Sequence, residues 1–336
     1  MQILKKVLKW LLILVVVLGI IYFIGPKVEP AVLTADMPTV STDLKQLENA
    51  ISKSEATYGL KPDNEARIVW ADSTKKQKTK YSIVYIHGFG ASWAEGEPVH
   101  RKIAQKYGCN LYLARLHDAG IKDREAFDDL TPENFYAGAK QALAIGKALG
   151  DSVIVMGCSA GGLLTVQLAA QHPELKGIML YSPCMAIFKD GLKPATGPWG
   201  KQILNAIVGE AREITQYKPD RAKYWLTRFR TEGLVTLQQV MDAVSKPAVY
   251  KAIKMPVWLG YYYKDEENQD KVVSVKAMLS LYDELGTPAN LKSKVAFPES
   301  GDHVIASFFT SKDIDGVVRE SDRFVAEVLK LKPVVK

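Results

Sequence analysis

The chain has 336 residues, of which 47% are hydrophobic and 24% are charged. This composition is that of a globular protein and excludes a disordered chain, while three cysteines exclude a disulfide-dense scaffold. The net charge of +7 includes four lysines within the first 27 residues, and without them 40 basic residues face 37 acidic ones. Such a mixed surface argues against a nucleic-acid-binding protein, and no cluster of cysteine and histidine indicates a structural metal.

The first thirty residues are predicted to be a membrane segment. Residues 10–26 read WLLILVVVLGIIYFIGP and carry no charge, and Lys9 and Lys27 flank them. A helix of this length spans roughly 25 Å, and the flanking lysines can reach the membrane surface. A cleaved signal peptide is the alternative, but no cleavage site of small residues follows closely. Three lysines precede the segment and one follows, which predicts a cytoplasmic N-terminus and an extracytoplasmic body.

The chain is predicted to divide into five segments. An anchor with a basic flank covers residues 1–30, and a tether covers 31–60. The core of the domain comes in two parts, 61–184 and 251–336, and a helical insertion over 185–250 separates them. The insertion carries Leu234, Leu237, Met241 and Val244 at helical spacing.

Short β-branched or aromatic runs alternate with helical stretches through the core. Runs such as SVIVM and YSIVYI are apolar on both faces, which is typical of a parallel sheet covered on both sides. The sequence therefore predicts an α/β fold with a mostly parallel, doubly wound sheet. The expected strands are 67–71, 81–86, 111–114, 152–156, 177–181, 256–262 and 294–297, and the expected helices are 96–107, 132–149, 160–171, 274–285 and 314–330.

A G-x-S-x-G motif lies between an expected strand and an expected helix. Residues 157–162 read GCSAGG and are followed by LLTVQLAAQ. Only small residues fit beside the serine in such a tight turn, which pushes the hydroxyl of Ser159 out above the sheet. The N–H of Ala160 and the helix dipole then face a developing oxyanion. The alternative is a glycine-rich packing turn with an incidental serine.

A second glycine-rich loop, HGFGAS over residues 87–92, follows the expected strand YSIVYI. Its glycines let the backbone fold back over the sheet, so that an N–H near Phe89 can point at the same oxygen as that of Ala160. We expect His87 to hold this loop through a hydrogen bond, and a role as catalytic base is the alternative.

A serine nucleophile needs a base, and the base needs an orienting acid. His303 follows the last expected strand, in a loop that returns over the sheet edge where Ser159 opens, so it is the predicted base. His172 lies about 20 Å along the helix that starts at Ser159 and cannot reach back to it. The other histidines are His87, His100 and His117.

The acid is expected in the loop after the preceding strand, where Asp265, Glu266, Glu267 and Asp270 compete. Asp270 stands directly before the Val-Val pair that begins the next packed segment and is the predicted acid. Asp265 is the alternative, and the remaining acids are expected to be solvated.

These motifs resemble those of the α/β-hydrolase superfamily, in particular its monoacylglycerol lipase and carboxylesterase-like members. The resemblance covers roughly residues 65–332 and rests on HGFGAS, GCSAGG, DKVV and GDHV in the family's order. A Pro-Gly-His-Gly loop of the family is replaced here by LHDAG at residues 116–120. The likeness implies a helical cap over about 185–250 and neither a metal nor an organic cofactor. The triad that it implies is Ser159, Asp270 and His303, with Phe89 and Ala160 as oxyanion donors.

Together these features predict a membrane-tethered serine hydrolase that cleaves a small-molecule carboxylic ester. In this chemistry Ser159 attacks the acyl carbon, His303 moves the proton, and Asp270 orients the imidazole. Some apolar surface of the insertion is expected to line the acyl site. The alternatives are an acyltransferase, an amidase or peptidase with the same triad, and a non-catalytic scaffold of this fold. No nucleic-acid partner is expected.

Overall fold

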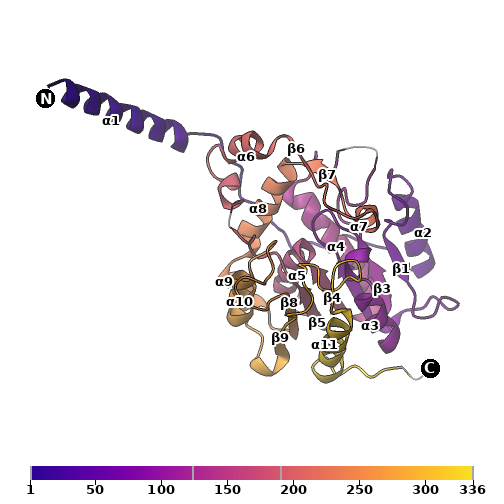
Figure 1. The fold of residues 1–336 in the computed structure, drawn as a ribbon. Helices are drawn as coiled ribbons and strands as arrows, with labels where there is room; N and C mark the ends of the chain where they lie inside the picture. The colour runs from indigo at the N-terminus through magenta and orange to yellow at the C-terminus, as the bar shows by residue number, and fades with distance from the viewer. Residues whose placement is uncertain (1, 123–124, 190, 335–336) are drawn as a thin grey trace.

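The computed structural model describes residues 2–122, 125–189 and 191–334, and a seven-stranded sheet forms its centre (Figure 1). All seven expected strands lie in this sheet, and only the edge pair β1–β3 is antiparallel. The prediction of a mostly parallel α/β sheet is confirmed. In spatial order the strands are β1 (Arg67–Val69), β3 (Asn110–Leu113), β2 (Thr79–Ile86), β4 (Gly150–Cys158), β5 (Gly177–Tyr181), β8 (Val257–Tyr261) and β9 (Lys292–Ala296).

Helices cover both faces of the sheet, and the alternation along each strand decides which face a side chain joins. In β2, Val84 and Ile86 join one apolar cluster, and Ile83 and Tyr85 join the other. The first cluster is shared with α4 (Pro132–Leu149), α5 (Ala160–Gln171) and α10 (Val275–Glu284). The second is shared with α3 (Val99–Tyr107) and α11 (Ile314–Glu327).

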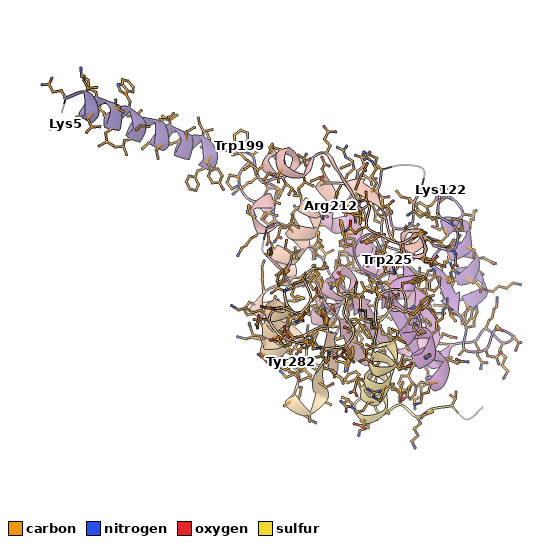
Figure 2. All side chains as sticks on the ribbon, viewed as in Figure 1. Lys5, Lys122, Trp199, Arg212, Trp225 and Tyr282 are labelled. Carbon is orange, nitrogen blue, oxygen red and sulfur yellow. The ribbon has the colours of Figure 1, made fainter. Side chains whose placement is uncertain are left out.

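The N-terminal helix α1 (Gln2–Phe23) has no buried residue and a mean hydropathy of 2.3. It is long and apolar enough to cross a membrane, a property that it shares with signal sequences. Figure 1 shows α1 standing away from the body. Figure 2 shows Trp199 at the end of α1 that meets the body, where its indole Nε1 donates a hydrogen bond to the Ile21 carbonyl (3.0 Å).

Residues 26–43, which we call the strap, run extended along the body. Three of their carbonyls, those of Pro26, Glu29 and Leu33, accept hydrogen bonds of 2.7 Å from Trp199, Gln239 and Gln171. Val28, Leu33, Met37 and Val40 are partly buried against the core. The segment expected as a tether is thus attached to the domain, and it continues into α2 (Leu44–Glu55), a helix capped by Asp43 that the sequence analysis did not anticipate.

The insertion between β5 and β8 is mostly helical, as expected. Its apolar pattern at 234–244 corresponds to the longest of its helices, α8. A short antiparallel hairpin, β6–β7, was not anticipated. In chain order the elements are the 3₁₀ helix η2 (Lys193–Thr196), α6 (Gly200–Val208), β6 (Ala211–Glu213), α7 (Pro219–Tyr224), β7 (Arg228–Arg230), α8 (Glu232–Val244) and α9 (Pro247–Ala252).

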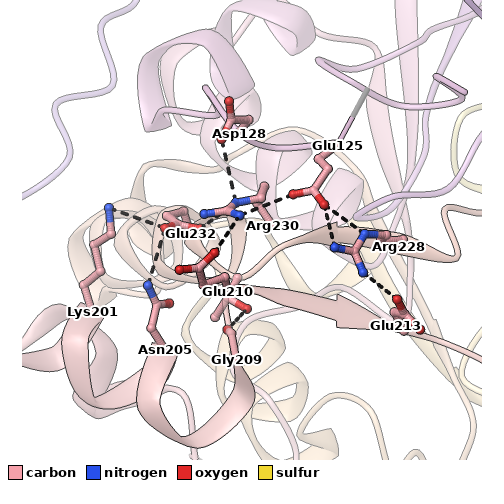
Figure 3. Close-up of polar contacts among 11 residues, drawn as sticks. Glu125, Asp128, Lys201, Asn205, Gly209, Glu210, Glu213, Arg228, Arg230 and Glu232 are labelled. Atoms are coloured by element: carbon pink, nitrogen blue, oxygen red, sulfur yellow. Dashed lines mark hydrogen bonds and ion pairs between the residues drawn. The ribbon is translucent and has the colours of Figure 1, made fainter. Parts of the chain in front are cut away.

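Two arginines of β7 attach this hairpin to the loop before α4 (Figure 3). The Arg230 N–H donates to the Ala126 carbonyl (2.8 Å). Single exposed ion pairs contribute little stability, but a network with backbone pairing beneath it fixes the register of the hairpin. The carboxylate partners of Arg228 and Arg230 are Glu125, Asp128, Glu210, Glu213 and Glu232.

The strap yields a prediction about stability. We compare a chain that begins at Pro26 with one that begins at Asp43. The shorter chain should lose about 2–4 kcal/mol of unfolding free energy, because four partly buried apolar side chains leave the core. Urea denaturation followed by circular dichroism measures the difference. Equal midpoints for the two chains would show that the strap contributes nothing to the fold.

Candidate active site

Ser159 occupies the turn between β4 and α5 with φ 53° and ψ −121°. A non-glycine residue in this region costs about 1–3 kcal/mol, so the surroundings must hold it there. They do so through the backbone: the Ser159 N–H donates to the Tyr181 carbonyl (3.0 Å), and its own carbonyl accepts from the Cys184 N–H (2.9 Å). The serine is thereby fixed at the carboxyl end of β4, at the centre of the sheet.

The glycines around Ser159 are required by close approach of the backbone. A Cβ on Gly161 would overlap the carbonyl oxygens of Ile86 and His87, which end β2 and begin the neighbouring loop. A Cβ on Gly157 would overlap the side chain of Thr165. The G-x-S-x-G spacing therefore lets α5 start directly against the loop after β2.

His87 supports that loop. The Leu116 N–H donates to His87 Nε2 (3.0 Å), which places the ring proton on Nδ1, and Nδ1 donates to the Gly88 carbonyl (2.8 Å). Burial lowers the pKa of His87 to about 4, so the ring is neutral. Both ring nitrogens are occupied by backbone groups, in line with the supporting role expected from the sequence.

The expected oxyanion donors lie on the two segments that Gly161 brings together. Among the described residues, the Phe89 N–H has no hydrogen-bond acceptor. Ala160 is the first residue of α5, so no intrahelical carbonyl accepts its N–H. The Phe89 ring packs in an aromatic cluster with Phe127 and Phe229 (centroids at 4.3 and 5.5 Å), which anchors the loop under the insertion.

His303 and Asp270 form a buried pair. Asp270 Oδ2 accepts from His303 Nδ1 (2.5 Å), and Asp270 Oδ1 accepts from the N–H groups of Val272 and Val273 (2.8 and 3.0 Å). Because Nδ1 donates to the carboxylate, Nε2 is the nitrogen able to take a proton. That atom is buried and has no hydrogen-bond partner among the described residues.

The structure brings Asp270, and not Asp265, to His303. Asp270 is 1% exposed. Asp265 is exposed, and its carboxylate caps the N–H groups of Glu267 and Asn268 in the same loop (3.0 and 2.7 Å).

Two opposing effects act on the pKa of His303. Burial, the largest single effect, lowers it, but the negative charge and hydrogen bond of Asp270 together with smaller contributions from Glu95 and Asp302 outweigh burial, so the pKa is raised. The three other histidines lie elsewhere: His100 is buried and bonded to the Trp93 carbonyl, His117 pairs with Asp129, and His172 ends α5.

A cavity of about 890 Å³ borders His303. Four aromatic side chains line it: Tyr217, Tyr262, Phe308 and Phe309. The insertion contributes mainly polar side chains, including Lys218, Asp220 and Arg221. The insertion therefore presents mainly polar side chains to this cavity, and Ser159 is not among the residues that line it.

Sequence reasoning missed two charged residues near this pair. Glu95, in the 3₁₀ helix η1 (Trp93–Gly96), is 2% exposed and accepts from the Gly88 N–H. Arg221 of α7 lies 3.6 Å from Asp302 and stacks on Tyr217 (4.4 Å from guanidinium carbon to ring centroid). In the sequence both look like ordinary surface charges, whereas in the folded chain Glu95 is buried and Arg221 is half-buried.

One group of side chains has the types that bind metals. Ligand atoms of His117, Asp118 and Asp129 lie within 4.8 Å of one another. They follow β3, and His117 and Asp118 line a second cavity, of about 400 Å³, beside α2 and α4. His117 Nε2 already pairs with Asp129 (2.8 Å), and this cavity is distinct from the one at His303.

Comparison with known proteins identifies the fold. A scan of protein-family models and a search of curated proteins match nothing. Among solved structures, the chain is similar to a lipolytic enzyme of the metagenome-derived pair LipS and LipT (17% identity, 79% of this chain and 98% of that one, TM-score 0.64). It is also similar to a soluble variant of monoglyceride lipase from Saccharomyces cerevisiae (14%, 81% and 92%, 0.59). A third is the enol-lactonase from Burkholderia xenovorans LB400 (16%, 78% and 96%, 0.51). The chain therefore has the α/β-hydrolase fold.

The close approach at Gly161 yields a prediction. Gly161→Ala should push α5 away from the loop after β2, because the new methyl group meets two carbonyl oxygens that cannot move independently of the sheet. We expect a loss of about 1–3 kcal/mol of unfolding free energy, measured by thermal denaturation. Gly191→Ala is the control, since a Cβ there meets no atom within 4 Å. A Gly161 variant as stable as this control would contradict the packing argument.

Proposed function

We propose that this α/β-hydrolase-fold protein is a serine hydrolase that cleaves carboxylic esters of small molecules. The observation that carries the proposal is the buried His303–Asp270 hydrogen bond, formed by two loops at the same edge of the sheet as the turn that presents Ser159. The fold alone serves many chemistries, so the argument rests on these side chains.

Each residue has a role that its surroundings permit. Ser159 Oγ attacks the acyl carbon while His303 Nε2 takes its proton, and Asp270 holds the opposite ring nitrogen and stabilises the imidazolium. The N–H groups of Phe89 and Ala160 bind the oxyanion. His303 then returns the proton to the leaving alcohol, and water releases the acid from the acyl-enzyme in a second round.

The raised pKa of His303 has a consequence for pH dependence. The imidazole must be neutral to accept the serine proton, so activity is present above the pKa of His303 and is lost as the pH falls through it. Because the pKa of His303 is raised, the loss of activity on the acid side of the pH profile should occur at a higher pH than an ordinary histidine would give.

The proposal includes attachment to a membrane through α1. No described residue of α1 is buried, so its apolar side chains are available to a lipid environment. Lys5, Lys6 and Lys9 precede the apolar stretch and only Lys27 closely follows it, so the N-terminus lies in the cytoplasm and the hydrolase domain outside it.

A first experiment tests the nucleophile. Ser159→Ala should lower kcat for p-nitrophenyl esters by on the order of a million-fold while keeping the melting temperature of the parent, because it removes the attacking oxygen and no buried contact. A fluorophosphonate probe should label the parent and not the variant. Labelling that survives the substitution would show that another residue is the nucleophile.

A second experiment separates the two aspartates. Asp270→Asn should lower kcat on the order of ten-thousand-fold, because an amide cannot hold the imidazole in the required tautomer. Asp265→Asn serves as the matched control, since its side chain only caps an exposed loop, and kcat should stay within about twofold of the parent. Steady-state kinetics on one ester decides the matter, and a reversed order would assign the acid to Asp265.

A further inference from the structure

Glu95 is a buried carboxyl group that the proposed mechanism does not use. It lies in η1, directly after the glycine-rich loop, and is 2% exposed. A carboxyl taken out of water is costly unless hydrogen bonds or opposite charge compensate it. No lysine or arginine forms an ion pair with Glu95 among the described residues, so its compensation must come from elsewhere.

The contacts of Glu95 place its carboxyl group next to Gly88, the residue that separates it from Ser159. Its Oε2 accepts a short hydrogen bond from the Gly88 N–H (2.5 Å), and the Tyr85 hydroxyl lies at 3.5 Å. A Cβ built on Gly88 would lie 2.8 Å from Glu95 Oε1 and 2.9 Å from Ser159 Cβ. Gly88 is thus enclosed between the carboxyl group and the serine, and no larger residue fits there.

Glu95 and His303 influence each other electrostatically. Burial raises the pKa of Glu95 to about 7, against the lowering effects of the Gly88 hydrogen bond and of His303. In return, Glu95 is the next contributor after Asp270 to the raised pKa of His303. The titratable and charged groups that surround this pair are Tyr85 of β2, Cys158 of β4, Tyr217 before α7, Arg221 of α7, Asp270 after β8 and Asp302 after β9.

We propose that Glu95 is a positioning residue for the hydrolysis proposed above. Its carboxyl holds the Gly88 peptide of the oxyanion loop beside Ser159, and its negative charge stabilises the imidazolium that His303 forms on taking the serine proton. The inference rests on the proposed function. Since a positive His303 favours the ionised carboxyl, the two groups titrate as a coupled pair.

The charge and the hydrogen bond can be separated by substitution. Glu95→Gln keeps an oxygen that accepts the Gly88 N–H but removes the negative charge. Kinetics across pH should show kcat lowered about tenfold with KM little changed, because the lost interaction acts on the transition state. The acid limb of kcat/KM should move to lower pH by up to about one unit, since removal of a neighbouring negative charge lowers the pKa of His303.

Glu97→Gln is the matched control, two residues along the chain. Glu97 is half-buried and its carboxylate bonds to Arg101 (2.8 Å), away from Gly88. This variant should keep the kcat and the acid limb of the parent. A folded Glu95→Gln variant with the kinetics of the parent overturns the proposal. So does a lower kcat with an unmoved acid limb, because that pattern describes a purely structural support.

A measurement without turnover separates this inference from the proposed function. The His303 ring can be titrated by NMR in the parent and in Glu95→Gln, with the signal assigned through a His303→Gln variant. A lower His303 pKa in Glu95→Gln supports the coupling even if no ester is hydrolysed, and an unchanged pKa overturns it even if the parent is active. If Glu95→Gln does not fold, Glu95→Asp replaces it: withdrawal of the carboxylate by one methylene should lower the His303 pKa by a smaller step, and no change overturns the proposal.

Discussion

The left-handed backbone of Ser159 is the constraint on which the rest of the site depends. A serine with φ 53° is stable only if the strand, the helix and the loop around it pack closely. In each of these three segments a glycine permits the close packing. Gly157 admits α5 close to β4, Gly161 admits the carbonyls that end β2, and Gly88 leaves room for the Glu95 carboxyl. The strain is thus held by packing around three glycines and by two backbone hydrogen bonds.

The parallel sheet brings the serine turn together with loops from three other strands. Because β2, β4, β8 and β9 run in one direction, the loops that follow them all leave from one edge. The glycine loop, the serine turn, Asp270 and His303 come from these four loops. Two buried carboxyl groups find hydrogen-bond partners here: Glu95 within the segment after β2, at the Gly88 N–H, and Asp270 across two loops, at His303. The cost of burying these carboxyl groups is offset by hydrogen bonds to nearby backbone N–H groups and, for Asp270, by the bond to His303 from a distant loop.

The insertion and the N-terminal segment meet on the same side of the molecule. Trp199 bonds to Ile21 and Pro26, and the strap continues from there along α8, α5 and α4 (Figure 1). The attachment of residues 26–43 means that α1 and the insertion are joined by a short, ordered segment. Under the proposed membrane attachment, the insertion is therefore the part of the domain nearest to the bilayer.

The features that the sequence determined by itself are those with a local pattern in the chain. The seven strands follow from apolar runs, α1 from an uncharged stretch, and the serine turn from glycine spacing between a strand and a helix. Asp270 was preferred to Asp265 because it adjoins a packed Val-Val pair, and the structure places Asp270 at His303. The tertiary structure alone decided the strap, the β6–β7 hairpin, the polar lining near His303 and the position of Glu95. A carboxyl at residue 95 has no local pattern that separates it from a surface acid, because the groups of β4, of the loop after β9 and of α7 that act on its pKa come together with it only in the folded chain.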